Sequence, residues 1–238
     1  MKSKPLIYLY FVLLILEMMG DIVFDLKGFP YGIWTFKPLL MPVLMFWYYK
    51  HTKAQTAFDK VILASLFFSW WGDNFLMPAI FKTDINFLLG LGSFLIAHVL
   101  YIVAFLKTNK KAKSILFILC FALPFALVGI GLISFLFKQN HPDFAEMSIP
   151  VMIYATVIMV MVVTAIGRYD RVNPASFKWV LLGALSFMVS DMAISLNRFT
   201  FLFEDTGYAA RLIIMPLYVI GQYLIAKGCV LQHKESLA

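Results

Sequence analysis

The sequence predicts an all-α fold, a polytopic membrane bundle of about eight transmembrane helices. Hydrophobic residues make up 62% of the chain and charged residues only 14%, with a mean hydropathy of +0.84. Apolar runs long enough to cross a bilayer recur along the whole length. The runs are continuous rather than alternating, which indicates helices and not a closed barrel, the other architecture that satisfies the backbone in lipid.

Each predicted helix is one apolar run. The eight runs cover residues 6–24, 33–49, 59–80, 85–106, 114–136, 148–167, 177–197 and 209–231. Their connections are short, so we expect a single integral membrane domain over residues 1–238. The first run follows Lys2 and Lys4, carries Glu17 and Asp21 at its far end, and lacks a small-residue cleavage site. We therefore interpret it as a retained helix rather than a cleaved signal peptide.

The distribution of lysine and arginine predicts the orientation. With the N-terminus inside, 14 of the 20 basic residues fall on the inner side and six on the outer side. Short loops rich in lysine and arginine stay in the cytoplasm. We therefore expect a multi-pass protein of a bacterial inner membrane with both termini in the cytoplasm. The net charge of +7 follows from this bias, so we expect no nucleic-acid partner.

Two apolar runs resemble each other and suggest an internal repeat. Run 59–80 contains Phe68 followed by Gly72-Asp73, and run 177–197 contains Phe187 followed by Ser190-Asp191. An offset of four helices keeps the direction of insertion, so the repeat predicts two parallel four-helix units around a pseudo-two-fold axis. Asp73 and Asp191 would then face each other across that axis. The match is short, and chance similarity is the alternative.

The two aspartates are the strongest functional signal in the chain. A carboxylate inside a membrane span costs at least a few kcal/mol, so such residues usually face a protein interior and have a function there. The competing interpretation is a polar residue that only binds a neighbouring helix. Burial favours a protonated carboxyl group, and two adjacent carboxylates hold one proton between them. Such a pair suits reactions through an oxocarbenium ion.

Further polar residues share helix faces with the aspartates or lie near helix starts, and they predict a polar pocket inside the bundle. Carboxylates are expected at its centre and cations nearer its rim. These residues are Glu17, Asp21, Lys37, His98, Tyr101, Ser190, Arg211 and Gln222. Each has a structural alternative: a core histidine, interfacial acids, cations that extend outward to the membrane surface, or a packing tyrosine.

Metal and cofactor chemistry are not expected. Three of the four histidines fall in loops or the C-terminal tail, and no two histidines have ligand spacing on one helix face. The chain shows no glycine-rich phosphate loop and no nucleophile elbow. Ser190 beside Asp191 has no assigned base and is not a convincing nucleophile.

Several motifs together resemble a known family. They are Lys37-Pro38-Leu39, Gly72-Asp73, the run Gly90–Tyr101, Ser190-Asp191, and Tyr218 with Gln222 and Gly228. In order and spacing they resemble the lysoplasmalogenase family of membrane proteins, also called the YhhN-like family. The resemblance implies hydrolysis of the vinyl ether bond of lysoplasmalogens. The products would be a fatty aldehyde and glycerophosphoethanolamine or glycerophosphocholine, so the expected partner is an alkenyl lysophospholipid in the membrane.

In this hypothesis Asp73 and Asp191 are the acid and the stabilising base, in an unassigned order. His98, Tyr101, Gln222 and Ser190 would orient them or the water, and Glu17 and Asp21 are possible additional acids. Lys37 and Arg211 would pair with the substrate phosphate. The alternative functions are a proton-coupled transporter or flippase for a lipid or small amphiphile, and a lipid-binding scaffold.

Overall fold

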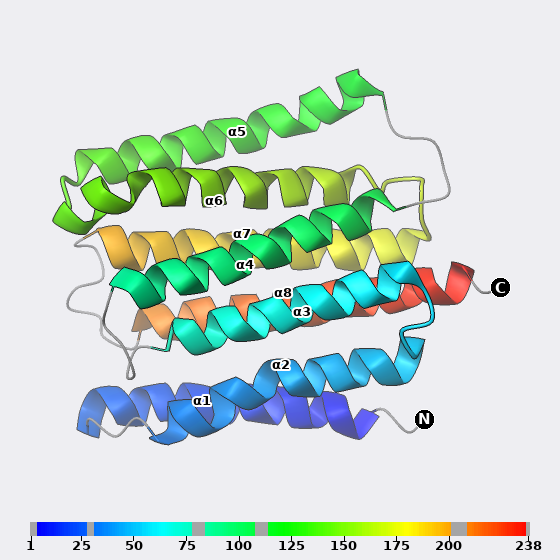
Figure 1. Ribbon diagram of the computed structural model, residues 1–238, viewed down its shortest axis with the longest axis horizontal. Coiled ribbons are helices and arrows are strands. Elements are labelled where there is room, and N and C mark those ends of the chain that lie inside the picture. Colours follow the sequence, from blue (N-terminus) through cyan, green and yellow to red (C-terminus); the bar gives the residue numbers. More distant parts are fainter. Residues whose placement is uncertain (1–3, 28–30, 78–83, 108–113, 201–208, 237–238) are drawn as a thin grey trace.

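Eight helices form one layered bundle in the computed structural model, which describes residues 4–27, 31–77, 84–107, 114–200 and 209–236 (Figure 1). Over these ranges the chain contains no strand. The helices are α1 (Lys4–Lys27), α2 (Tyr31–Thr52), α3 (Ala57–Phe75), α4 (Asp84–Leu106), α5 (Ile115–Lys138), α6 (Pro142–Ile166), α7 (Pro174–Phe199) and α8 (Ala209–Ser236). The prediction of an all-helical polytopic bundle is confirmed.

Successive helices run in alternate directions, so the start of α1 and the end of α8 lie at the same end of the bundle (Figure 1). We call this the terminal end, and the opposite one the far end. An even number of helices requires this arrangement. The cytoplasmic location of the terminal end stays a prediction.

Six of the helices, all except α2 and α3, are long and apolar enough to cross a membrane. The sequence analysis expected eight. In α3, only 19 residues long, Asp59, Lys60 and Asp73 interrupt the apolar run. Helix α2 contains Lys37, two prolines and several aromatic residues of low hydropathy. Both helices nevertheless lie along their neighbours within the bundle (Figure 1).

The start of α6 differs most from the prediction. It begins at Pro142 rather than at residue 148. Proline suits the first turn of a helix because its amide would have no intrahelical partner there and its φ is already helical. The polar residues Asp143 and Glu146 lie before the predicted apolar run, but they belong to the first turns of the helix. The predicted continuation of the third helix to residue 80 is wrong, because α3 ends at Phe75 with Leu76 as its C-cap.

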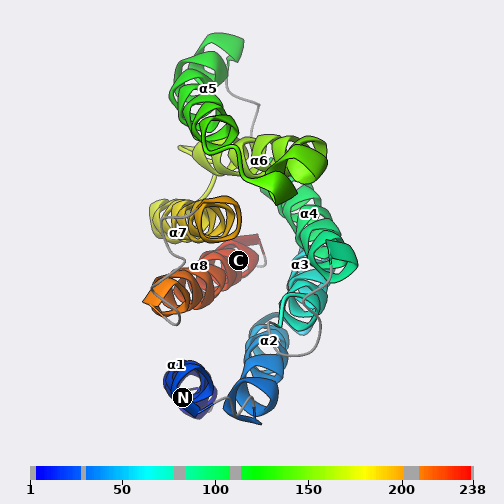
Figure 2. The same ribbon diagram turned by 90° about the vertical axis from the view of Figure 1, so that its left-hand side faces the viewer.

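The helices pack in a repeated pattern that agrees with the expected pseudo-two-fold arrangement (Figure 2). Helix α1 packs on α2, α2 on α3 and α3 on α4; in the second half α5 packs on α6, α6 on α7 and α7 on α8. Between the halves, α4 packs on α6 and α8 on α2. The symmetry fails at α1 and α5. Helix α1 also packs against α8, whereas α5 lies at the periphery with most of its large apolar side chains exposed.

Helices α7 and α8 approach each other closely because glycine faces glycine. A Cβ atom on Gly183 would lie 2.6 Å from the carbonyl oxygen of Gly221. Small residues permit such contact between membrane helices. The hydroxyl groups of Ser186 and Ser190 on α7 donate to main-chain carbonyls of α8, at 2.7 and 3.0 Å. The main chains of these two helices are therefore held in fixed register.

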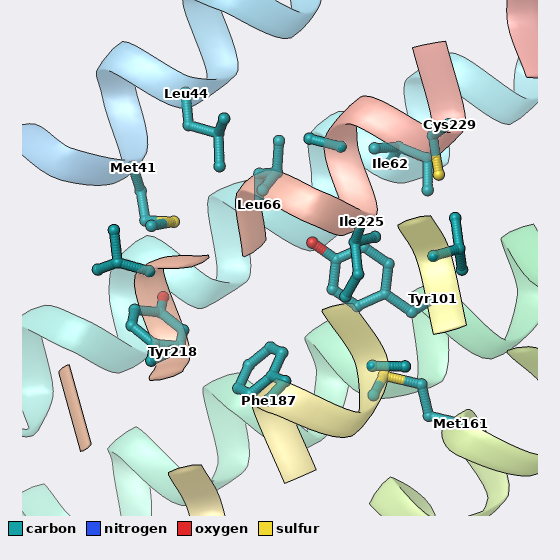
Figure 3. Close-up of a cluster of buried hydrophobic side chains, with 14 of the residues drawn as sticks. Met41, Leu44, Ile62, Leu66, Tyr101, Met161, Phe187, Tyr218, Ile225 and Cys229 are labelled. Carbon is teal, nitrogen blue, oxygen red and sulfur yellow. The ribbon is translucent and has the colours of Figure 1, made fainter. Parts of the chain in front are cut away.

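Two separate clusters of buried apolar side chains fill the bundle. The main cluster draws on every helix except α5 for its buried residues and includes Met41, Leu66, Tyr101 and Phe187 (Figure 3). The second cluster lies between α5, α6 and α7 and consists of Leu136, Phe144, Met147, Val151 and Phe199. The boundary between the two clusters, which we call the seam, lies beside Asp191.

A buried polar cluster fixes the terminal end. Asp59 completes a capping box with Thr56 at the start of α3 and accepts a hydrogen bond from Tyr48. Its Oδ2 atom lies 2.9 Å from Nδ1 of His233 near the end of α8. Close by, Arg168 donates to Ser176, and desolvation by burial lowers the pKa of the Arg168 guanidinium from its ordinary value. These contacts join the loop ends of helices, so we assign them a structural role.

Candidate active site

A pocket of about 460 Å³ lies at the far end of the bundle. Helices α1, α2, α3, α4, α7 and α8 all contribute to its wall. Its size is typical of ligand pockets. The lining residues are Glu17, Asp21, Lys37, Asp73, Phe75, Leu76, Met77, Phe87, Phe94, Ser190, Asp191, Ile194, Asn197, Arg198, Arg211, Ile214, Met215 and Tyr218.

Four carboxylates line this pocket. Asp73 and Asp191 are 3% and 6% exposed, and Glu17 and Asp21 on α1 are each 1% exposed. The structure thus brings together the two aspartates and the two additional acids that the sequence analysis named. Carboxylates this deeply buried are rare unless they are paired or hydrogen-bonded, so their partners determine what they can do.

Asp191 has two partners from two other helices. The hydroxyl group of Tyr154 on α6 donates to Oδ2 at 2.5 Å. Nε2 of His98 on α4 lies 3.3 Å from the same oxygen. The other ring nitrogen of His98, Nδ1, lies 2.7 Å from the carbonyl oxygen of Phe94. Asp191 therefore lies at the meeting point of α4, α6 and α7.

The ring of His98 is anchored through one nitrogen and faces Asp191 with the other. A carbonyl oxygen can only accept, so Nδ1 of His98 carries a hydrogen and donates it to Phe94. Nε2 lies 3.3 Å from Asp191 and makes no hydrogen bond with the described residues. Nε2 is therefore the ring nitrogen that is available to a reaction at Asp191.

Asp73 has a different environment. The hydroxyl group of Tyr218 on α8 donates to Oδ2 of Asp73 at 2.7 Å. Lys37 on α2, 9% exposed, attracts this carboxylate electrostatically. A Cβ atom on the preceding residue, Gly72, would lie 2.5 Å from the ring of Phe94, so this glycine allows Phe94 to pack directly on the backbone of α3. Asp73 thus faces a phenol from α8 and a cation from α2, whereas Asp191 faces a phenol and an imidazole.

Arginines mark the mouth of the pocket. Nε of Arg211 lies 2.8 Å from Oδ1 of Asp21, and Nη2 of Arg198 lies 3.0 Å from Oδ2 of Asp143. The Arg211 side chain is 23% exposed and that of Arg198 is 37% exposed, far more than any of the four lining carboxylates. Exposure therefore increases from the acids to the arginines. A ligand that enters meets positive charge before it meets the aspartates.

The other predicted site residues lie at the edge of the pocket or outside its wall. Ser190 lines the pocket, but its hydroxyl group donates to the carbonyl oxygen of Ile214 on α8. Tyr101 donates to Oε1 of Gln222 at 2.6 Å, and Nε2 of Gln222 donates to Ser69 at 2.9 Å. Neither Tyr101 nor Gln222 is among the lining residues. Together with Ser69 they connect α4, α8 and α3 one helical turn from Asp73, on the side of the terminal end.

The sequence analysis missed Tyr154 and did not include Arg198 in the site. Tyr154 lies in the apolar stretch of α6 that follows Glu146, where a tyrosine cannot be distinguished from a packing residue. For Arg198 a signal existed, because it follows Asp191 by seven residues and so shares its helix face. In the part of the chain that the structure describes, no three side chains among His, Cys, Asp and Glu are arranged to hold a metal ion.

Comparisons with known proteins agree with this reading of the chain. The sequence pattern of the YhhN family matches residues 32–229. Proteins named lysoplasmalogenase from Mycobacterium bovis and Mycobacterium tuberculosis are each 29% identical over 114 residues. These residues make up 48% of this chain and 41% of each relative, so the match spans less than half of their length. No solved structure matches. Because the family pattern covers most of the chain, from α2 to the last turns of α8, the chain belongs to the YhhN family.

Proposed function

We propose that this protein hydrolyses the vinyl ether bond of a lysoplasmalogen, releasing a fatty aldehyde and a glycerophospho head group. One observation carries the proposal: Asp73 and Asp191 line a single pocket, where Asp191 lies beside a histidine and Asp73 faces a lysine. The name of the mycobacterial relatives supports the same substrate class. A vinyl ether is cleaved by acid catalysis, which needs this combination of a proton donor and a nearby negative charge.

We assign the acid to the His98–Asp191 pair, because Nε2 of His98 lies only 3.3 Å from Oδ2 of Asp191 and a proton carried by either group lies close to the other. This proton goes to the vinyl carbon remote from the ether oxygen, where the electrons of the carbon–carbon double bond form the new carbon–hydrogen bond. A lone pair of the ether oxygen then forms a second bond to the vinyl carbon that the oxygen carries. The result is an oxocarbenium ion. The Asp73 carboxylate, held by Tyr218, stabilises this positive charge.

Water then adds to the oxocarbenium carbon, and Asp73 accepts the proton that water loses. The hemiacetal breaks down when this proton passes to the glycerol oxygen and the carbon–oxygen bond breaks. The hydroxyl proton of the hemiacetal returns to the His98–Asp191 pair, and the aldehyde forms. One water is consumed, and both carboxylates regain their starting state.

The cations at the mouth suit the substrate phosphate. Arg211 and Lys37 both line the pocket, and a guanidinium group can bind phosphate and carboxylate oxygens at the same time through its several N–H donors. In the proposed complex Arg211 keeps its bond to Asp21 and adds the phosphate. The vinyl ether group then lies further inside, between the two aspartates.

The test is aldehyde release by the purified protein from a 1-alkenyl lysophospholipid and from its 1-acyl analogue. We expect release from the alkenyl lipid alone, and losses of at least about a hundredfold for Asp73→Asn and Asp191→Asn. Glu146→Gln is the matched control, because it makes the same change at an exposed position of α6 outside the pocket. This variant should match the wild type.

If the folded protein releases aldehyde from neither lipid, the proposed hydrolysis is ruled out. The same outcome would favour proton-coupled transport, which liposome flux assays can measure. We also propose that the terminal end faces the cytoplasm of a bacterial inner membrane, so that the pocket opens toward the other side. A reporter fused to the C-terminus that is active only outside the cytoplasm should stay inactive.

A further inference from the structure

A narrow crevice extends from the pocket toward α6. It has a volume of about 20 Å³ and shares Leu76, Phe87, Phe94, Asp191 and Ile194 with the pocket. Its remaining wall consists of Leu91 on α4, Val151 and Tyr154 on α6, and Ser195 on α7. The crevice therefore starts at Asp191 and leads between α4, α6 and α7.

The polar atoms in this wall are all engaged. The Tyr154 hydroxyl group donates to Asp191, and the Ser195 hydroxyl group donates to the main-chain carbonyl of Asp191 at 3.2 Å. What the wall offers to a ligand is hydrocarbon. The pocket itself is different, since it contains four carboxylates and three cationic side chains. The two spaces therefore suit different parts of one amphiphilic molecule.

The crevice also follows the seam between the two apolar clusters. Phe94 belongs to the main cluster, whereas Val151 belongs to the second. Side chains across such a seam are not interlocked as they are within one core. Leu76 and Leu91 line the crevice at this seam, and leucine side chains can change between staggered rotamers. An added alkyl chain can separate these side chains without exposing polar backbone, because α4, α6 and α7 keep their own helical hydrogen bonds.

From these features we infer that the crevice is the binding site for the hydrocarbon chain of the substrate, which leaves the pocket between α4 and α6. The inference rests on the proposed function for the identity of the lipid. It fixes the direction in which the substrate lies: head group at Arg211, vinyl ether at Asp191, and chain along Leu91 and Val151 toward the bilayer. Leu91 and Ser195 then determine which chain lengths are accepted.

The first test measures kcat/KM for aldehyde release from hexadecenyl and hexenyl lysophospholipids with the same head group. A tryptophan in the crevice should exclude the long chain but leave room for the short one in the pocket. For Leu91→Trp we expect the ratio of long-chain to short-chain kcat/KM to fall at least about tenfold, since one or two misfitted methylenes have effects of this size. Ser195→Leu, a smaller change, should shift the ratio in the same direction.

Leu89→Trp is the matched control, because Leu89 lies on the same helix but is exposed on its outer surface. It should leave the ratio unchanged. If the crevice variants are folded and active and retain the wild-type ratio, the chain does not bind there. That result would overturn the inference and leave the proposed hydrolysis intact.

A second test does not depend on catalysis. A 1-alkyl lysophospholipid, which has no vinyl ether, carries a diazirine at the end of its chain and is cross-linked by light to the wild-type protein. Peptides from α4 and α6 should carry the label, and Leu91→Trp should reduce it. Labelling confined to α1 and α2 would overturn the inference, even if the protein releases no aldehyde.

Discussion

His98 and Asp191 are joined by a contact of 3.3 Å between Nε2 and Oδ2, while the other ring nitrogen of His98 donates to the Phe94 carbonyl. The acid of the proposed reaction is therefore a pair from two helices and not a single residue. Replacing either partner should therefore impair the proposed acid.

The first prediction concerns the histidine. An asparagine at position 98 can still donate to the Phe94 carbonyl but has no atom that reaches Asp191. His98→Asn should therefore fold with a melting temperature near that of the wild type. Aldehyde release should fall by about a hundredfold or more, the usual effect of losing a positioned acid. Full activity in the folded variant would exclude His98 from the acid pair.

The second prediction concerns Tyr154. Tyr154→Phe removes only the hydroxyl group that donates to Asp191 at 2.5 Å. A hydrogen bond to a charged group contributes about 1.5–3 kcal/mol, which corresponds to a change in kcat/KM between about tenfold and a hundredfold. Steady-state kinetics provide the measurement. Tyr8→Phe on the exposed face of α1 is the control and should have no effect.

The third prediction concerns the ion pair between Arg211 and Asp21. Arg211→Ala leaves the buried Asp21 carboxylate without its cation, and this should cost about 3 kcal/mol of stability. The double variant Arg211→Ala with Asp21→Asn should recover most of that loss in a thermal unfolding experiment in detergent. Its KM should stay raised, because the proposed phosphate ligand is still missing. A wild-type KM in the double variant would show that Arg211 does not bind the head group.

The fourth prediction concerns helix packing. An alanine at Gly183 would place its Cβ atom 2.6 Å from the backbone of α8, which cannot move aside as a side chain can. Gly183→Ala should therefore cost about 1–3 kcal/mol of stability. Gly131→Ala is the control, because nothing lies within 4 Å of the added atom, and it should be neutral or slightly stabilising. Thermal unfolding of both variants in detergent measures this difference in stability, and equal stability of the two variants would contradict the prediction.

The fifth prediction separates the site from other buried acids. Asp59 is as buried as Asp73, but it lies at the terminal end with Thr56, Tyr48 and His233. Asp59→Asn should lower the melting temperature because the capping box and ion pair weaken. The activity per folded molecule should remain. Loss of activity without loss of stability would mean that the two polar clusters act together.

The sequence predicted the all-helical architecture and the main acids because both depend on composition along the chain. An aspartate in an apolar run is conspicuous, as Asp73 and Asp191 are. The partners of these residues could not be predicted in the same way. Tyr154 is recognised only when α6 packs against α7, and nothing in its own helix distinguishes it from the other buried tyrosines.

Local sequence also did not show where Tyr101 and Gln222 lie relative to the pocket wall. Both occur in motifs close to His98 and Tyr218, which suggested a place beside the carboxylates. One helical turn separates them from the pocket, and that turn is enough for them to bond to each other instead. The start of α6 was misplaced for a related reason, since Asp143 and Glu146 are polar but belong to the helix and not to a loop.

The exchange of partners between the two halves of the bundle has a consequence for how such a site can arise. Asp73 in the first half takes its hydroxyl partner from α8, and Asp191 in the second half takes its imidazole partner from α4. A symmetric dimer of identical four-helix chains would have to give both carboxylates the same partner. A single chain of two unequal halves has no such restriction, and here Asp191 has an imidazole beside its phenol whereas Asp73 has a phenol alone from α8. Two carboxylates at equivalent positions can therefore have different roles only when the two halves that hold them differ, as the halves of this single chain do.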